Sequence, residues 1–424
     1  MNNVVALIET ILLVLFAIPV LYLLFLMVAA AFYRRPRLQL ANAGSNPEHF
    51  IILIPAHNES LTLPATLETI KQLRSGESQP EPKVVVIADN CTDNTAEIAR
   101  SAGVMVLERH DQTLRGKGHA LEWAIAKLMQ EYDQSQFSAL VIFDADTVPD
   151  PDFLQEASYA LQCGGQVLQG RYGVLKPNET WRSLLLYTAL VIYNHIRPLG
   201  RASLGLSDGL RGNGMVFRRA ILEQYPWQAF SLVEDLEYAT RLALAGVPVT
   251  YVPEAQIYGQ AASNRKQATT QRMRWEGGRF KQARQDVPPL LRRAVKKGDF
   301  NAFDRAMDLI IPPLALLVLM LGAFTVLDTV LCLVLGGDWL SATVIGWLGL
   351  LVGIGLFVLG GLLVARAPLS AYLALLFAPF YVLWKMQIYA RMLVKRAPQE
   401  WTRTPRARID LSDIQAQADL KKRG

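Results

Sequence analysis

The sequence predicts an α/β domain with a Rossmann-like, mostly parallel sheet, joined to α-helical transmembrane segments. Three observations lead to this fold class. Short apolar runs alternate with segments of helical periodicity in the middle of the chain, as is typical of parallel α/β sheets. Long apolar runs lie near the beginning of the chain and in its last third. The hydrophobic content of 51% over 424 residues is high for a wholly soluble protein.

The first apolar run, Ile11 to Phe32, predicts a membrane anchor within residues 1–37. It holds 22 residues without a charge, enough to cross a hydrocarbon core about 30 Å thick. Arg34, Arg35 and Arg37 follow it. Because the cations come after the run, we expect a retained anchor and not a cleaved signal peptide. By the positive-inside rule, this is a multi-pass protein of the cell inner membrane whose central domain is cytoplasmic.

The C-terminal part is expected to return to the membrane. We predict a basic, amphipathic interfacial segment at 286–308, about three transmembrane helices at 309–389, and a basic tail at 390–424. Three full crossings would leave the tail outside, against the charge rule. Since Pro379 and Lys385 interrupt the last run, we favour a broken or surface-lying final segment. The three apolar runs are Leu309 to Leu335, Val344 to Ala365 and Leu369 to Tyr389.

The charges and cysteines indicate a cytoplasmic protein in contact with membrane lipids. The net charge of +6 concentrates in Arg265 to Lys297 and after Tyr389, as expected for segments that meet anionic headgroups. No basic module with interleaved aromatics is present, so nucleic acid is not an expected partner. The spacing of Cys91, Cys163 and Cys332 suggests neither disulfides nor a zinc site.

The central domain is predicted over residues 48–285. Its strands are short, apolar and rich in β-branched residues, and the segments between them have helical spacing. The expected strands are Phe50–Ile54, Val84–Ala88, Val104–Leu107 and Leu140–Phe143, and the expected helices are Leu61–Leu73, Thr95–Ser101 and Gly118–Met129.

A pair of aspartates follows the last of these strands, in the run "LVIFDADTVPDPDFLQ". In open α/β sheets, ligands bind beyond the carboxyl ends of the strands. Asp144 and Asp146 repel each other unless a cation lies beside them, and hard oxygen ligands suit Mg²⁺ or Mn²⁺ bound together with substrate phosphates. The alternative is a polar turn in which Asp and Pro only set the bend. Neither a dinucleotide fingerprint nor a P-loop is present.

Three further stretches carry candidate site residues, each with a structural alternative. "GLRGNGMVFRR" surrounds Asn213 with glycines, which allow the backbone to approach a ligand or simply form a turn. "LVEDLEYATRLALAG" begins a helix at Glu234 and Asp235, where acidic residues also serve as caps. "QRMRWEGGRF" contains an Arg–Trp pair that would equally suit a membrane interface.

Together these stretches resemble the membrane-embedded family 2 glycosyltransferases, the group of cellulose, chitin and hyaluronan synthases and the rhizobial chitooligosaccharide synthases. The resemblance covers Ile51 to Phe280 by motif and the whole chain by layout. The motifs, in family order, are "IPAHNES", "ADNCTDNTAEIA", "RGKGHAL", "FDADTVPD", "RGNGMVF", "VEDLE" and "QRMRW".

The resemblance implies a GT-A-like fold, a UDP-sugar donor, a divalent metal ion and inversion at the anomeric carbon. It also assigns the donor side of the site. Glu59 and Asp89 match positions that hold the uridine, Lys117 a diphosphate contact, Asp144 a donor-binding aspartate and Asp146 the metal ligand.

On the acceptor side, Asp235 matches the general base of the family, with Glu234 expected among the substrate-binding residues. The family pattern is usually Thr-Glu-Asp, and this chain has Val233 in place of Thr while it retains both carboxylates. Gly212, Asn213 and Gly214 match the loop that bears on the acceptor. Gln271, Arg274 and Trp275 match the signature that touches the diphosphate and the acceptor sugar.

The acceptor expected from the resemblance is a growing polysaccharide or oligosaccharide. The alternative is a membrane lipid that is glycosylated in one step. A membrane-tethered nucleotide sensor is a third hypothesis, against which the retained aspartates count. The basic tail around Trp401, Thr402 and Arg403 is expected to be either a lid over the donor site or a headgroup-binding segment.

Overall fold

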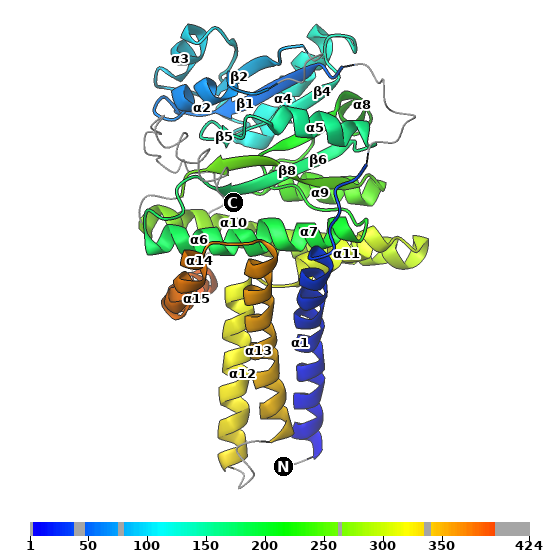
Figure 1. Ribbon diagram of the computed structural model, residues 1–424, viewed down its shortest axis with the longest axis vertical. Coiled ribbons are helices and arrows are strands. Elements are labelled where there is room, and N and C mark those ends of the chain that lie inside the picture. The colour runs from blue at the N-terminus through cyan, green and yellow to red at the C-terminus, as the bar shows by residue number, and fades with distance from the viewer. Residues whose placement is uncertain (1–2, 38–46, 75–79, 262–264, 335–340, 395–424) are drawn as a thin grey trace.

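The computed structural model describes residues 3–37, 47–74, 80–261, 265–334 and 341–394. Figure 1 shows three levels: a sheet domain, a layer of helices that lies across its base, and a bundle of long helices that points away from it. The site lies where these levels meet.

The sheet has eight strands in the order β3-β2-β1-β4-β7-β6-β8-β5. Pairing is parallel from β3 through to β4 and between β6 and β8, whereas β7 is antiparallel to both of its neighbours. The predicted mostly parallel sheet is therefore confirmed, and its antiparallel pairings make it a mixed sheet. The strands are β1 (Phe50–Ala56), β2 (Lys83–Asp89), β3 (Met105–Arg109), β4 (Ala139–Ile142), β5 (Val148–Pro149), β6 (Val167–Val174), β7 (Met215–Arg218) and β8 (Val249–Gly259).

Helices cover both faces of the sheet because the inner strands are apolar on both sides. Alternate residues of β1 point to opposite faces: Ile51 and Leu53 join one core, and Ile52 and Ile54 join the other. The first core lies under α4 (Lys117–Glu131), α8 (Arg219–Gln224) and α9 (Glu234–Ala245), and the second under α2 (Leu63–Ile70), α3 (Thr95–Ser101) and α5 (Phe153–Gln162).

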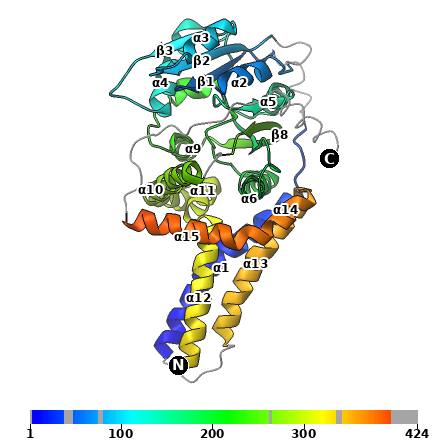
Figure 2. The same cartoon turned by 90° about the vertical axis from the view of Figure 1, so that its left-hand side faces the viewer.

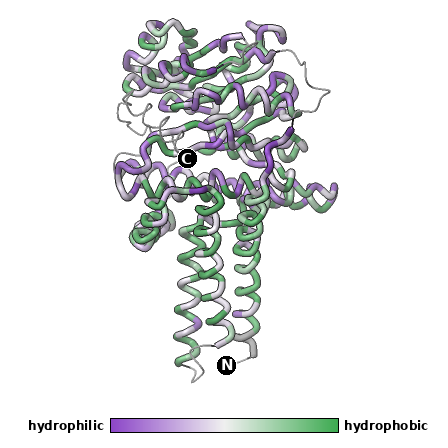
Figure 3. Tube along the Cα trace, in the orientation of Figure 1, coloured by the Kyte–Doolittle hydropathy of each residue, from purple (hydrophilic) through white to green (hydrophobic). Residues whose placement is uncertain are grey.

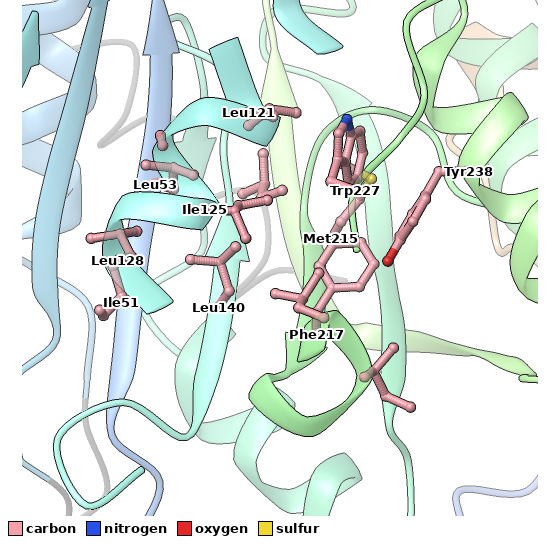
Figure 4. Close-up of a cluster of buried hydrophobic side chains, with 14 of the residues drawn as sticks. Ile51, Leu53, Leu121, Ile125, Leu128, Leu140, Met215, Phe217, Trp227 and Tyr238 are labelled. Carbon is pink, nitrogen blue, oxygen red and sulfur yellow. The ribbon is translucent and has the colours of Figure 1, made fainter. Parts of the chain in front are cut away.

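The first core fixes the helix that carries Asp235. Figure 4 shows Tyr238 of α9 beside Trp227 and Phe217. The ring centroid of Tyr238 lies 4.4 Å from that of Trp227 and 5.8 Å from that of Phe217, and all three side chains are buried. Such aromatic pairs add about 0.5–1.5 kcal/mol each beyond the area they bury. The first turn of α9 is therefore held at a defined distance from the sheet.

The predicted strands and helices of this domain are present, with shifts at their ends. The largest difference is the helix expected over Leu61–Leu73, which is observed only as α2 (Leu63–Ile70). The chain ahead of it forms a turn in which the Glu59 carbonyl accepts the N–H groups of Thr62 and Leu63.

Below the sheet lies an interfacial layer of helices. It contains α6 (Trp181–Leu190), the π-helical segment η2 (Val191–Ile196), α7 (Arg197–Ser203), α10 (Arg265–Lys297) and α11 (Phe300–Ile310). The domain boundary predicted between residues 285 and 286 falls inside α10, so a single helix belongs to both predicted parts.

Three long apolar helices, α1 (Asn3–Ala30), α12 (Leu314–Val334) and α13 (Ala342–Val364), form the bundle. Figure 3 shows that they are hydrophobic along most of their length. The apolar run that we expected from Leu309 begins as a helix only at Leu314, because α11 ends at Ile310 and Pro312 and Pro313 precede α12.

The last apolar run is broken into α14 (Leu369–Ala374), the 3₁₀ turn η3 (Leu375–Phe377) and α15 (Ala378–Val394). Among the described residues, four segments have the length and composition of membrane spans, Leu369–Met392 among them, so membrane embedding fits the fold. Figure 2 shows α15 lying across the base of the interfacial layer, not along the bundle. This agrees with the surface-lying alternative. The tail segment with Trp401, Thr402 and Arg403 lies outside the described residues.

Candidate active site

A cavity of about 2330 Å³ extends from the carboxyl ends of β1, β2 and β4, along α10, to the near ends of the bundle helices. Most of the residues singled out from the sequence line it, although they come from separate elements. These residues are Glu59, Asp89, Lys117, Asp144, Asp146, Gly212, Glu234, Asp235, Gln271, Arg274 and Trp275.

The loop after β4 is held in place by Asn213 from the loop before β7. The Oδ1 atom of Asn213 accepts the N–H of Asp144 at 3.2 Å and the hydroxyl of Thr147 at 3.0 Å. Gln169 of β6 donates to the Asn213 carbonyl at 2.9 Å. Asn213 therefore joins two loops, and its side chain is buried.

This arrangement changes the expectation for the glycine loop. Among Gly212, Asn213 and Gly214, which we expected to bear on the acceptor, only Gly212 lines the cavity. Gly214 adopts φ +66°, and a Cβ there would lie 2.5 Å from Ile257. Asn213 and Gly214 therefore lie behind the cavity wall, where they position the Asp144–Asp146 loop.

Lys117 joins the acidic groups of the site. It begins α4 directly after Gly116, whose φ of +112° allows the chain to turn into the helix. Its Nζ atom donates to Asp144 Oδ1 and to the Gly212 carbonyl, each at 2.5 Å, and lies 3.8 Å from Glu234 Oε1. Burial favours loss of the proton, but Asp144 and Glu234 outweigh it and raise the pKa of Lys117. Lys117 is therefore a fixed cation.

Glu234 and Asp235 begin α9 and face this cation. Burial raises the pKa of Glu234 to about 7 against the opposing effect of Lys117. Burial also raises the pKa of Asp235, although the Leu236 N–H donates to its Oδ1 atom at 2.8 Å. A Cβ on Gly212 would lie 3.3 Å from Asp235 Oδ2. The carboxylate of Asp235 thus lies against the loop at Gly212, on the cavity wall.

Val233, which replaces the usual Thr of the family pattern, has a packing role. A Cβ on Gly278 of α10 would lie 2.6 Å from Val233 Cγ1, so the valine fills the space that the glycine leaves. This close approach brings the first turn of α9 against α10, which carries Gln271, Arg274 and Trp275 at helical spacing.

At the other end of the cavity, Asp89, which we expected to bind uridine, already accepts hydrogen bonds from neighbouring side chains. Its Oδ1 atom accepts from the buried Arg109 at 2.7 Å and from Asn90 Nδ2 at 3.1 Å. Glu59 Oε2 accepts the hydroxyl of Thr62 at 2.9 Å. Arg109, at the end of β3, is a site residue that sequence reasoning missed, since nothing in the local pattern links it to Asp89.

A second missed contact ties α10 to α15. Lys385, visible in the sequence only as an interruption of an apolar run, forms a buried ion pair with Glu276, the residue after Trp275. Both residues line the cavity. The sequence shows an unusual cation at position 385, but the separation along the chain hides its partner.

Comparison with known families identifies the scaffold. A family model described as "Glycosyltransferase like family 2" matches residues 47–278, more than half of the chain. This chain belongs to that family. The membership confirms the resemblance seen in the motifs.

Relatives and solved structures agree with this family. The chain is 25% identical over 241 residues to a probable glycosyltransferase, YdaM, of Bacillus subtilis, a match of 54% of each chain. It is 23% identical over 260 residues to poly-beta-1,6-N-acetyl-D-glucosamine synthase of Staphylococcus epidermidis, or 58% of each chain. The matched region thus spans about half the length of these curated relatives.

Among solved structures, a mannosyltransferase from Pyrobaculum calidifontis matches 84% of this chain and 98% of its own length. The TM-score is 0.51 and the sequence identity 17%. This likeness confirms a GT-A-like glycosyltransferase fold.

The residues at the end of β4 fit a hard divalent cation. Asp144 and Asp146 provide carboxylate oxygens on the cavity wall. Within the described parts of the chain, no three His, Cys, Asp or Glu side chains form a closed cage. Mg²⁺ and Mn²⁺ sites in phosphate-binding enzymes need no such cage, because one or two carboxylates act together with phosphate oxygens and water.

Proposed function

We propose that this protein transfers a sugar, with inversion, from a UDP-sugar to an acceptor held at the membrane boundary. The continuity of the cavity carries the proposal. It joins the aspartates after β4 and the carboxylate of Asp235 to α10 and to the near ends of the bundle helices. A donor and a membrane-held acceptor can therefore meet in one space.

In this mechanism Asp235 removes the proton from an acceptor hydroxyl, which attacks the anomeric carbon opposite the departing nucleoside diphosphate. A raised pKa suits a base that works near neutral pH. Lys117 and Arg274 offset the negative charge that grows on the leaving diphosphate. Asp146, with Asp144 beside it, would hold a Mg²⁺ or Mn²⁺ ion, which supplies Lewis-acid stabilisation of the leaving group.

A solved neighbour supports a nucleotide-sugar donor and a divalent metal ion. The Pyrobaculum calidifontis mannosyltransferase was solved with GDP-Man and Mn²⁺. Since its donor carries guanine, the base is best tested with both UDP- and GDP-sugars. The arginines after α1 support the proposal that the site faces the cytoplasm, and we propose the inner membrane as its location.

The geometry favours a lipid-linked acceptor. The bundle residues on the cavity wall, which include Leu23, Val318 and Ile354, belong to the halves of α1, α12 and α13 nearest the sheet domain. No described residue in the far halves lines the cavity. The cavity thus reaches the near ends of the bundle helices without following the bundle along its length, which suits an acceptor whose lipid part stays at the membrane boundary.

A growing polysaccharide is the second candidate. It is supported by relatives named as polymer-forming enzymes, the poly-beta-1,6-N-acetyl-D-glucosamine synthase and a probable glucomannan 4-beta-mannosyltransferase of Arabidopsis thaliana, which is 28% identical over 255 residues. The size of the radiolabelled product separates the candidates. One chloroform-soluble species favours the lipid acceptor, and a ladder of lengths favours the polymer.

The reaction itself is tested by release of nucleoside diphosphate from a panel of UDP- and GDP-sugars with Mg²⁺ or Mn²⁺. We expect metal-dependent release that is abolished in Asp235→Asn, whereas nucleotide binding stays nearly intact. Glu97→Gln, an exposed change on α3 away from the cavity, serves as the control. Full activity in Asp235→Asn would remove the base from the mechanism. A nucleotide sensor would bind the donors without releasing diphosphate.

A further inference from the structure

A buried cluster of arginines lies where α7, α10 and α11 meet, beside the cavity of the candidate site. Each of its charged side chains is buried. Four guanidinium groups share two carboxylates, so the cluster carries an excess of positive charge. We call it the arginine cluster; its members are Arg197, Arg201, Arg279, Arg305, Asp304 and Asp308.

The hydrogen bonds show which arginines lack a compensating charge. Asp308 accepts from Arg197 at 2.6 Å, from Arg201 at 2.9 Å and from Arg305 at 3.4 Å. Asp304 accepts from Arg201 at 2.8 Å. Arg279 donates to the Tyr193 hydroxyl at 2.6 Å and to the main-chain carbonyls of Asp308 and Ile311, and no carboxylate among the described residues accepts a hydrogen bond from it.

The nearest additional carboxylate does not neutralise the excess positive charge of the arginine cluster. Asp208 lies 4.0 Å from Arg201, but it binds Arg211 through two hydrogen bonds of 2.6 Å and 2.9 Å. That arginine therefore brings its own positive charge. Burial also lowers the pKa of Arg197, with Asp308 opposing, and Asp308 itself has a pKa held well below its usual range by the surrounding arginines.

Two members of the arginine cluster, Arg197 and Arg279, line the catalytic cavity together with Tyr193. The buried Nε atom of Arg197 has no hydrogen-bond acceptor among the described residues. An uncompensated buried cation with an unused donor is costly unless an anion binds there. Guanidinium groups match the oxygen geometry of phosphate particularly well.

The cavity wall beyond these arginines is apolar. It is formed by side chains from α1, α12, α13 and the segment before α12. A ligand that fills this part of the cavity needs a hydrocarbon portion next to its anionic group. The lining residues are Leu23, Ile311, Leu314, Val318, Ile354 and Phe357.

We propose that the acceptor is an anionic phospholipid-type amphiphile. Its phosphate binds Arg197 and Arg279, its hydrocarbon chain lies along the apolar wall, and a hydroxyl of its headgroup reaches Asp235. This inference rests on the proposed function and specifies its acceptor. The headgroup hydroxyl gives its proton to Asp235 and forms the new bond to the anomeric carbon, while the bond to the diphosphate breaks and its electron pair leaves with the nucleoside diphosphate.

The test is calorimetric binding of short-chain phosphatidylglycerol to the full-length protein in neutral detergent. Two related probes separate the parts of the ligand: a short-chain diacylglycerol, which lacks the phosphate, and glycerol phosphate, which lacks the chains. We expect phosphatidylglycerol to bind at least about tenfold more tightly than either. Equal affinity for diacylglycerol would overturn the phosphate site, and equal affinity for glycerol phosphate would overturn the lipid.

Substitutions locate the site. Arg197→Gln and Arg279→Gln should each weaken phosphatidylglycerol binding by about ten- to a hundredfold. Arg305→Gln is the matched control, since Arg305 belongs to the arginine cluster but does not line the cavity; its affinity should stay within a few-fold of wild type. Unchanged affinity in both Arg197→Gln and Arg279→Gln contradicts the proposal.

Binding of UDP with Mn²⁺ is measured on the same samples. It should be unchanged in the arginine variants, which also shows that they are folded. If nucleotide binds and is turned over normally but phosphatidylglycerol does not bind, only the acceptor inference fails. If no nucleotide binds to the wild type, the proposed function fails instead.

Discussion

At the scale of single residues, the candidate site is an arrangement of like charges held together by one lysine. The residue types were predictable: Asp144, Asp146 and Asp235 follow strand ends or begin a helix, and all three line the cavity. The hydrogen bonds that hold the acidic residues of the site in place were not predictable. The bond between Asp144 and Asn213 and the bond between Asp89 and Arg109 each join residues that lie far apart in the sequence. The roles assigned to these residues stay predictions.

Replacing Lys117 should change both the rate and its pH dependence. Lys117→Met leaves Asp144 and Glu234 without their cation, and we expect kcat to fall by roughly 10²–10³-fold. Lys117 also lowers the pKa of Asp235, which burial raises. Without the lysine that pKa rises further, and activity that requires the carboxylate is lost at a higher pH as the solution is acidified.

The measurement is the pH profile of kcat/KM for wild type and Lys117→Met. The acidic limb of the wild type should lie above the usual pKa of an aspartate, and that of the variant should lie higher still. Lys127→Met, an exposed lysine on the same helix, should leave the profile unchanged. An acidic limb at the same pH in all three proteins would show that Lys117 does not act on the base.

Gly212 offers a test that separates strain from site geometry. An alanine there must adopt φ +76°, and its Cβ would lie 3.3 Å from Asp235 Oδ2 and 3.7 Å from Lys117 Nζ. Gly103 has nearly the same φ, +78°, but a Cβ there meets no atom within 4 Å. Each alanine should lower the free energy of unfolding by about 1–2 kcal/mol. Only Gly212→Ala should lower activity strongly, and equal activity in the two variants would show that the wall at Gly212 is not part of the site.

At the scale of elements, the helices and strands with the clearest local pattern of apolar and polar residues were predicted best from the sequence. The strands β1, β2 and β4 are short apolar runs flanked by polar residues, so their positions were predicted to within a few residues. The segment from Trp181 to Ser203 and α11 mix apolar and charged residues, because each faces the sheet domain on one side and the bundle on another. Their burial depends on tertiary partners, which a local pattern does not contain.

The docking of α15 depends on the ion pair between Lys385 and Glu276. Removing one partner leaves a buried charge, so Lys385→Met or Glu276→Gln alone should destabilise the protein by about 3–5 kcal/mol. The double variant should recover most of this loss. The exposed pair Arg100–Glu108 is the control, and its coupling should be at most about 1 kcal/mol.

A double-mutant cycle, measured by thermal unfolding in nanodiscs, gives the coupling energy. Additive effects at Lys385 and Glu276 would mean that the pair does not hold α15 against α10. The single variants that are destabilised should also lose activity, since both residues line the cavity.

At the scale of the whole molecule, the course of the chain through the bundle determines on which side α15 and its basic residues Lys385 and Arg391 lie. Helix α1 ends at the sheet domain, α12 leads away from it and α13 returns, so α15 lies on the same side as the domain. The sequence left two topologies open because length and composition alone make Leu369–Met392 a fourth candidate span. The crosswise position of α15 removes the conflict with the positive-inside rule.

This topology predicts from which side of the membrane a single cysteine can be labelled. Each such cysteine is introduced into a variant whose native cysteines have been replaced. Arg391→Cys should react with a membrane-impermeant maleimide from the same side of sealed vesicles as Thr113→Cys in the sheet domain. Val334→Cys, at the far end of α12, should react only from the opposite side. Labelling of positions 391 and 334 from one side would indicate a fourth crossing.

The central claim is that Asp146 and a divalent ion together hold a nucleoside diphosphate beyond the end of β4. Calorimetric titration of the full-length protein in nanodiscs with UDP and with GDP tests it most directly, in Mn²⁺ and after chelation. We predict binding of one nucleotide with Mn²⁺, weakened at least about tenfold by chelation or by Asp146→Asn. Equal affinity with and without the metal ion, or in Asp146→Asn, would contradict this account.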